Sequence, residues 1–168
     1  IRDKETADIG IRASLTGHLV FSTLHTNDAP STITRLLEMD IEPFLIASSV
    51  LGVVAQRLVR LLCQKCKESY SPLPGSMEGV FLEDLLTPTL TLYRSKGCYH
   101  CNHKGYKGRM AIHEMMPITS LLRDAIKRKA SRDEIGSIAV QQGMISMRRD
   151  GIQKAIAGLI DIQEVMRV

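Results

Sequence analysis

The chain has 168 residues, of which 44% are hydrophobic and 24% are charged. This length and composition are typical of one globular domain or two small ones, and they exclude a disordered tail or a fibrous repeat. The longest largely apolar run, residues 43–62, is interrupted by polar and charged side chains, so it falls short of the roughly 20 apolar residues that span a bilayer. Because the first residue is not Met, we expect the chain to be part of a longer protein.

The formal net charge of +4 is unevenly distributed along the chain. Residues 1–50 carry a net charge of −3, residues 51–110 of +5 and residues 111–168 of +2. All four cysteines lie in the basic middle segment. If they are thiolates around one Zn²⁺, the centre has a net charge of −2, which the excess Lys and Arg would neutralise. Without the metal, the same excess would indicate a nucleic-acid-binding surface.

The beginning of the chain has the order of helix, buried strand, loop and helix that is typical of a parallel α/β sheet. Asp3 can cap a helix over Thr6–Leu15, and Gly17 can end it in the left-handed conformation. The apolar, β-favouring run over residues 18–24 predicts a strand that is buried on both faces. Further helices are predicted over residues 30–39 and 43–52.

The middle of the chain is rich in loop-forming residues. Arg57–Cys63 alternates as a strand does, whereas residues 71–90 contain repeated Pro and Gly around a short helix predicted at Phe81–Leu86. Gly105–Gly108 is predicted to be a turn that leads into a strand over Arg109–Met116.

Helical signals dominate the rest of the chain. Ser131 and Glu134 form a capping box, in which each side chain can bind the backbone amide of the other residue. A later helix is predicted over residues 147–157. Asp161 and Glu164 have the spacing that caps a last short turn.

Two cysteine pairs, Cys63-Gln-Lys-Cys66 and Cys98-Tyr-His-Cys101, are separated by 31 residues. The CxxC spacing turns two sulfurs and nearby backbone amides toward one ion, and two such knuckles complete a closed tetrahedral zinc site of four thiolates. Because this site leaves no open position for a substrate, it is structural and stabilises a loop-rich segment that buries little apolar area by itself.

Other states of these cysteines remain open from the sequence alone. They could form two disulfides or stay as four buried free thiols, although nothing in the sequence indicates an oxidising compartment. A ligand set that includes His100 or His103 is a further alternative. We rank it lower because the four thiolates already fill the four positions.

His25 follows the predicted buried strand, within the polar segment Ser22-Thr-Leu-His-Thr-Asn27. Ligands of open α/β sheets bind beyond the carboxyl ends of parallel strands, where a neutral imidazole can contact a phosphate or a nucleophilic water. The alternative is a strand-end histidine that binds a backbone carbonyl. Arg57 and Arg109 could likewise contact an anion or line a solvated strand edge.

Five segments occur in an order that resembles one known family. They are Ile1-Arg-Asp-x-Glu-Thr-Ala7, Ala13-Ser-Leu-Thr-Gly-His-Leu19, Ser22-Thr-Leu-His-Thr-Asn27, Ala55-Gln-Arg-Leu-Val-Arg60 and the CxxCxxxGYKGR motif that ends at Arg109. In this order they resemble the C-terminal half of bacterial secretion-superfamily ATPases, in particular the type II secretion ATPase (the E protein) and the type IV pilus extension ATPase. The related retraction ATPases lack the cysteine insertion, which favours this branch.

The resemblance implies an α/β fold: the C-terminal part of a RecA-like parallel-sheet ATPase domain, with a tetracysteine zinc insertion and a C-terminal helical region. Residues 1–62 would form the RecA-like segment with the Walker B tail and the His box. Residues 63–108 would form the zinc-binding subdomain, and residues 109–168 a strand followed by the helical region.

Roles for individual residues also follow from the resemblance. Arg2 and Asp3 resemble the tail of the Walker B segment, and His25 resembles the catalytic histidine of the His box near the γ-phosphate. The four cysteines match the zinc ligands of the family.

Three further residues, Gln56, Arg57 and Arg109, lie in motifs that line the nucleotide side of the family's domain. The resemblance implies zinc in this chain, and ATP and Mg²⁺ in the full-length enzyme. It also implies a homo-hexamer at the cytoplasmic face of the inner membrane, where an inner-membrane platform protein is its partner and nucleic acid is not. ATP hydrolysis would drive extension of a pilus or pseudopilus.

The sequence departs from this family in several ways. No GxxxxGK[ST] motif occurs in the chain, so we expect the P-loop to precede residue 1 and this chain alone not to hydrolyse ATP. Lys104 stands where the resemblance leads us to expect Thr or Ser. The alternatives are a zinc-ribbon module that binds nucleic acid, and a protein-interaction scaffold without catalysis.

Overall fold

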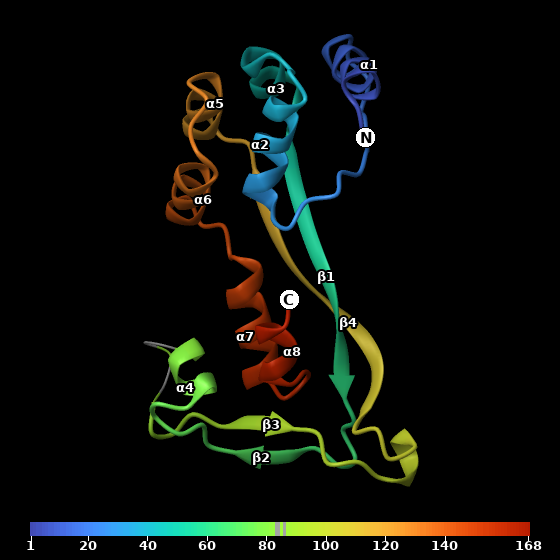
Figure 1. The fold of residues 1–168 in the computed structure, drawn as a ribbon, viewed down its shortest axis with the longest axis vertical. Coiled ribbons are helices and arrows are strands. Elements are labelled where there is room, and N and C mark those ends of the chain that lie inside the picture. Colours follow the sequence, from blue (N-terminus) through green and yellow to red (C-terminus); the bar gives the residue numbers. More distant parts are fainter. Residues whose placement is uncertain (83–84, 86) are drawn as a thin grey trace. The chain divides into compact units, whose positions relative to one another are not determined.

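The computed structural model describes residues 1–82, 85 and 87–168. The chain forms two compact units, each built from two stretches of sequence. The first unit contains residues 1–55 and 114–146, and the second contains residues 56–113 and 147–168. Helices and strands occur in both, which confirms the predicted α/β composition (Figure 1).

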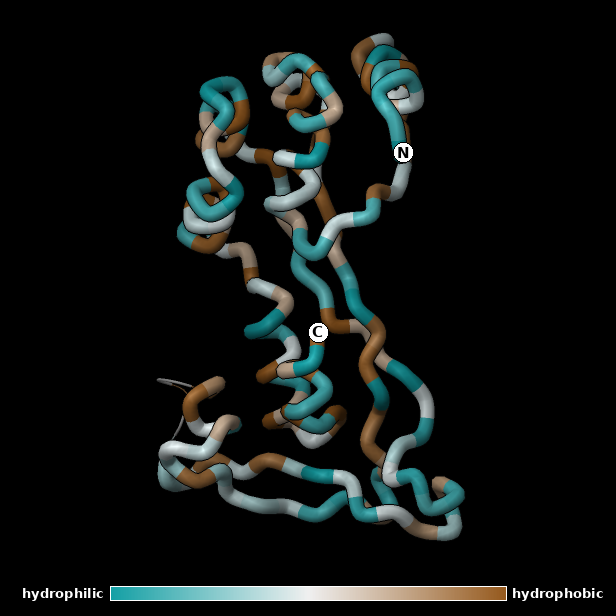
Figure 2. The backbone as a smooth tube through the Cα atoms, in the orientation of Figure 1, coloured by the Kyte–Doolittle hydropathy of each residue, from teal (hydrophilic) through white to brown (hydrophobic). Residues whose placement is uncertain are grey.

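The paired strands β1 (Gly52–Leu62) and β4 (Tyr106–Pro117) form a two-stranded sheet, and each strand contributes residues to both units. Apolar stretches alternate with polar ones along both strands (Figure 2). Both strands are longer than the sequence predicts: β1 begins before Arg57, and β4 begins inside the turn predicted at residues 105–108. Pairing between the strands supplies the backbone hydrogen bonds that local sequence signals do not reveal.

Helices make up most of the first unit; four of them were predicted individually, and the one over Ser120–Lys127 only as part of a helical region. They are α1 (Lys4–Leu15), α2 (Ala29–Glu38), α3 (Pro43–Ser49), α5 (Ser120–Lys127) and α6 (Arg132–Gln141). The Asp3 carboxylate accepts a hydrogen bond of 2.9 Å from the Thr6 amide, which confirms the predicted cap of α1. The Ser131 hydroxyl caps α6 as predicted, but the Glu134 carboxylate binds Arg128 instead of completing the box.

The core of the first unit consists of branched aliphatic side chains from these helices. Ile33, Ile46, Leu122, Ile126 and Ile135 are at most 1% exposed. Burying each side chain of this size contributes about 1.5–3 kcal/mol, so the packing between helices holds this unit together.

The strand predicted over residues 18–24 is wrong for this structure. These residues have no regular secondary structure, and Leu19 and Phe21 are 71% and 88% exposed. Among the described residues, the hydrogen-bonded strands are β1 with β4 and β2 with β3, so this segment has no neighbour in a sheet. A β-favouring sequence remains extended but does not become a strand when it lacks a pairing partner.

The second unit contains short elements around the cysteines and a pair of C-terminal helices. They are β2 (Glu68–Tyr70), α4 (Met77–Leu82), β3 (Leu92–Arg94), the 3₁₀ turn η2 (Tyr99–Cys101), α7 (Met147–Ile156) and α8 (Ile162–Met166). Strands β2 and β3 pair antiparallel, with Ser69 opposite Tyr93. The core of this unit includes Leu82, Leu92 and Ile152.

The helix predicted over residues 81–86 begins earlier, as α4, and residues 83, 84 and 86 lie outside the described part of the chain. The α7 and α8 helices confirm the two predicted C-terminal helices. In the described part of the chain, no helix combines the length and apolar character that crossing a membrane requires.

A buried carboxylate ties α8 to β1 in the second unit. Glu164 is 2% exposed and accepts hydrogen bonds from both the backbone amide (2.9 Å) and the guanidinium (2.8 Å) of Arg60. These hydrogen bonds lower the pKa of Glu164 to about 2. The Arg60 guanidinium also lies 4.0 Å from the centre of the Tyr106 ring. Glu164 therefore joins a strand and a helix that are far apart in sequence, instead of capping its own helix as predicted.

Glu164→Gln should destabilise the chain by about 2 kcal/mol at neutral pH, because the hydrogen bonds from the Arg60 amide and its half-exposed guanidinium lose a charged acceptor. Urea unfolding measures this difference. Because the pKa is lowered from 4.5 to about 2, the stabilisation is fully present above pH 4.5 and is lost as the pH falls toward 2. The difference between wild type and variant should therefore shrink over that range.

The control is Glu38→Gln, which removes an exposed ion pair to Arg35 and should change stability by less than about 1 kcal/mol. Equal losses in the two variants, or a Glu164→Gln effect that does not depend on pH, would contradict the role assigned to Glu164.

Candidate metal centre

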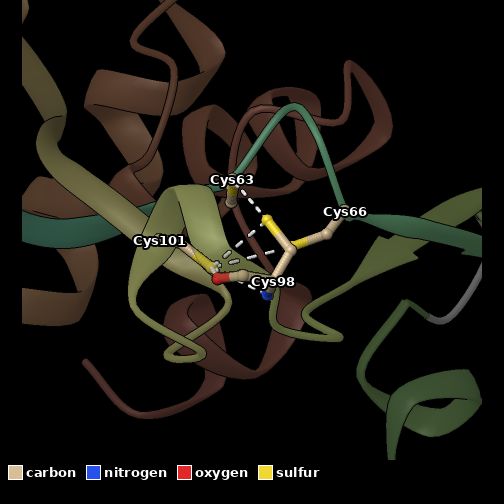
Figure 3. A group of neighbouring side chains, drawn as sticks. All are labelled: Cys63, Cys66, Cys98 and Cys101. Carbon is tan, nitrogen blue, oxygen red and sulfur yellow. Dashed lines mark hydrogen bonds between the residues drawn. The ribbon is translucent and has the colours of Figure 1, made fainter.

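The four cysteines converge from two loops of the second unit. Cys63 directly follows β1 and begins a turn that Cys66 ends. Cys98 directly precedes η2, and Cys101 is the last residue of η2. Figure 3 shows their side chains gathered in one small region. The sulfur of Cys63 lies 4.0 Å from that of Cys98, and the sulfur of Cys101 lies 3.8 Å from those of Cys66 and Cys98.

This arrangement fits one tetrahedral ion. All four sulfur atoms lie within 4.8 Å of one another. A tetrahedral ion with four sulfurs at about 2.3 Å requires sulfur–sulfur distances of about 3.8 Å, which is close to the separations observed. The structure thus brings together the four cysteines that the sequence predicts to be ligands, and they can hold a metal ion.

Two alternatives raised from the sequence, disulfides and a histidine ligand, are not supported by this geometry. All four cysteines are free, so no disulfide joins them. His100 and His103 are exposed and are not part of the ligand cluster found among the described residues. The His100 Nε2 atom instead lies 3.3 Å from the Lys107 Nζ atom.

Gly105 connects the two cysteine loops, a role that the sequence did not reveal. Its amide donates a hydrogen bond of 3.2 Å to the Cys101 sulfur, and its carbonyl accepts one of 2.9 Å from the Cys63 amide. Its φ of 77° lies in the left-handed region, and a Cβ atom would come within 2.5 Å of the Ser95 Cβ. The only sequence signal was that of a turn glycine.

Hydrogen bonds and burial shift the pKa values of two of the thiols, Cys101 and Cys66, in opposite directions. Burial opposes ionisation of Cys101, but hydrogen bonds from the amides of Cys98 and Gly105 outweigh it and lower its pKa to about 6. Burial raises the pKa of Cys66 to about 12. A bound divalent cation reverses such penalties and favours the thiolate at every ligand.

The predicted Walker B and His-box residues lie in the first unit. Arg2 and Asp3 are exposed, and Asp3 accepts hydrogen bonds from the amide and hydroxyl of Thr6, both 2.9 Å long. The Thr6 amide is the main cause that lowers the pKa of Asp3. His25 is exposed on the segment that precedes α2. Their catalytic roles remain predictions.

The other predicted nucleotide-side residues lie in the second unit. Gln56 and Arg57 are consecutive in β1 and therefore point to opposite faces of the strand, and Arg109 is exposed in β4. These three residues belong to the second unit, whereas the predicted Walker B and His-box residues belong to the first.

Comparison with known proteins identifies the family. The profile of the family described as "Type II/IV secretion system protein" matches residues 1–167. The chain belongs to the type II/IV secretion system protein family.

Curated relatives in this family are similar along the whole chain. The "Type II secretion system ATPase E" of Vibrio cholerae is 48% identical over 168 residues, which are 100% of this chain and 33% of that protein. The "Type IV pilus assembly ATPase PilB" of Thermus thermophilus is 46% identical over 166 residues, which are 99% of this chain and 19% of that protein. The chain thus spans between about a fifth and a third of these relatives' length.

Solved structures confirm the fold predicted for a secretion family member. The pilus retraction motor PilT with bound ADP has a TM-score of 0.64 at 21% identity, over 99% of this chain and 37% of that one. The ATPase DotB of Legionella pneumophila has a TM-score of 0.62 at 20% identity, over 99% of this chain and 36% of that one. At these identities, the similarity establishes the RecA-like fold alone.

Gly105→Ala should weaken metal retention, because a Cβ would displace Ser95 and misplace the amide that binds the Cys101 sulfur. We expect the rate of metal loss to a chelator to rise by about tenfold or more, within the range found for lost outer-shell contacts. Gly75→Ala is the control, since Gly75 also has a positive φ but lies in open space away from the cysteines. Equal rates of metal loss in both variants would contradict the role of Gly105.

Proposed function

We propose that this chain is the C-terminal portion of a hexameric traffic ATPase that powers assembly of a type II secretion pseudopilus or a type IV pilus by ATP hydrolysis. The observation that carries this proposal is the family match over residues 1–167. It is supported by identities of 46% and 48% to relatives whose names are those of pilus-assembly and type II secretion ATPases.

ATP and Mg²⁺ would be bound by the full-length enzyme. The GxxxxGK[ST] motif, whose amides and lysine hold the phosphates, does not occur in these 168 residues. This chain alone therefore does not hydrolyse ATP. In the full-length enzyme, His25 is the catalytic residue near the γ-phosphate, Arg2 and Asp3 belong to the Walker B segment, and ATP supplies the phosphoryl group that is transferred to water.

Residues of the second unit would complete the nucleotide side of the enzyme. Gln56, Arg57 and Arg109 supply polar and cationic groups from β1 and β4. The guanidinium groups suit phosphate oxygens, because they donate several hydrogen bonds and stay charged.

Zinc is the ion that the cysteine cluster fits best. Four thiolates at tetrahedral separations are a typical structural zinc set, and they leave no position for a substrate. Cys63, Cys66, Cys98 and Cys101 would hold the ion, which stabilises residues 63–108 as a subdomain. This subdomain is a rigid contact surface for a neighbouring subunit or for a membrane partner.

The full-length motor would act as a homo-hexamer in the cytoplasm, peripheral to the inner membrane, with the inner-membrane platform protein as its partner. The names of the relatives support a role in pilus assembly or secretion. The hexamer, its location and the platform partner are what the family resemblance implies.

The nucleic-acid alternative is disfavoured by the aromatic side chains of the second unit. Cations already lie over the rings of Tyr106, Tyr93, Tyr70 and Phe81, at 4.0 to 5.6 Å from the ring centres. Each of these four rings has a cation on one face, and Tyr99, which is 89% exposed, is a single open ring instead of the several on which successive bases of single-stranded nucleic acid stack.

His25→Ala in the full-length motor tests the proposed function. ATP turnover should fall by about 100-fold or more, because a group that acts on the γ-phosphate or its attacking water contributes about this factor. The KM for ATP should change little, because the P-loop provides most of the ground-state binding.

His18→Ala is the matched control, since His18 lies on the same exposed segment and its Nδ1 atom is near Thr16 and Ala13 instead. Turnover that is unchanged in His25→Ala, or that falls equally in both variants, would remove His25 from the active site.

A further inference from the structure

The segment that carries His25 is tied to parts of the first unit that are distant in sequence. Three residues after His25, the Asp28 Oδ2 atom accepts two hydrogen bonds from the Arg132 guanidinium, 2.6 Å from Nη2 and 3.2 Å from Nε. The next amide, that of Ala29, donates a hydrogen bond of 2.7 Å to the Glu114 Oε1 atom. These partners come from α6 and β4, 104 and 85 residues away in the sequence.

Asp28 is a junction between two helices. Its Oδ1 atom accepts a hydrogen bond of 2.7 Å from the Ser31 amide and caps α2, whereas its Oδ2 atom binds Arg132, the first residue of α6. Burial opposes ionisation of Asp28, but the hydrogen bonds from Arg132 and Ser31 outweigh it and hold the pKa of the carboxyl below its usual range. The positive N-terminal ends of α2 and α6 also stabilise the charged form of this carboxylate.

The Glu114 contact is buried, whereas the Arg132 contact is accessible from solvent. Glu114 is 5% exposed, and the Arg132 side chain is 54% exposed. Both residues and Asp28 line a hollow of about 540 Å³ between α2 and α6. The half-exposed Arg132 guanidinium also binds the Asp133 carboxylate, at 2.6 Å through Nη1, so solvent and a second carboxylate both reach this contact.

We propose that Arg132 is a positioning residue that fixes the His25 segment through Asp28 and so couples α6 to the histidine proposed to act near the γ-phosphate. The proposal rests on the proposed function for the role of His25. Consecutive Cα atoms lie about 3.8 Å apart, so anchoring Asp28 keeps the Cα atom of His25, three residues away, within about 11 Å of the anchor. A displacement of the α6 N-terminus therefore moves the anchor of this segment.

Hydrogen exchange in this chain tests the positioning without relying on ATP hydrolysis. In Arg132→Ala, the Ser31 amide should exchange about tenfold faster, because the carboxylate that caps it is no longer held, and the Ala29 amide should exchange faster because its segment loses one of its two anchors, Arg132 and Glu114. Asp28→Asn keeps a capping oxygen but loses the charge that binds Arg132, and we expect it to accelerate exchange of the Ala29 amide in the same way.

The matched control is Arg128→Ala. Both arginine side chains are 54% exposed and bind a carboxylate, but Arg128, which follows α5, binds Glu134 of α6 instead of Asp28. Exchange near residue 28 should be unchanged in this variant. Unchanged exchange in Arg132→Ala, an effect in Arg132→Ala that Asp28→Asn does not reproduce, or faster exchange throughout β4 and α5 would overturn the proposal.

Steady-state kinetics of the full-length motor measure the consequence for His25. Arg132→Ala should lower kcat about tenfold with an unchanged KM for ATP, and Arg132→Lys should restore part of kcat because it keeps the charge. A change in both kcat and the KM for ATP, or an unchanged kcat, would overturn the coupling. If exchange responds as expected but His25→Ala leaves turnover unchanged, the positioning contact stands and the proposed function fails.

Discussion

Four sulfur atoms within 4.8 Å of one another impose the constraint on which the segment between the cysteine pairs depends. The strands of this segment, β2 and β3, have only three residues each, and they bury few large side chains. Apolar burial alone is a weak basis for a loop-rich segment of this size, so in the proposed zinc site metal–sulfur bonds would replace part of a core. Thiolates this close repel one another unless a cation lies between them, so we expect folding of this segment and binding of the proposed zinc ion to be one process.

Buried carboxylates connect elements that are distant in sequence elsewhere in the chain. Glu164 binds both the amide and the side chain of Arg60 in the second unit, and Glu114 binds the first amide of α2 in the first unit. In each case a carboxylate from one element satisfies backbone groups of another that is distant in sequence. These contacts fix where strands and helices meet, and in the first unit they lie next to the segment that carries His25.

Local signals in the sequence predicted the helices and the cysteine cluster, because caps and CxxC spacing act over a few residues. Asp3 and Ser131 cap helices as predicted, and the family resemblance is confirmed. The sequence did not predict that residues 18–24 lack a pairing strand, because pairing depends on distant parts of a sheet. It also assigned Glu164 to a local cap, although its partner Arg60 lies 104 residues away. Such contacts leave no pattern in neighbouring residues.

X-ray absorption at the zinc edge of the purified chain tests the central claim most directly. The account predicts one zinc per chain with four sulfur neighbours at about 2.3 Å, and no nitrogen or oxygen neighbour. It also predicts that removing the ion unfolds residues 63–108. A chain that retains its fold without bound metal, or a zinc ion with histidine or water among its neighbours, would contradict it.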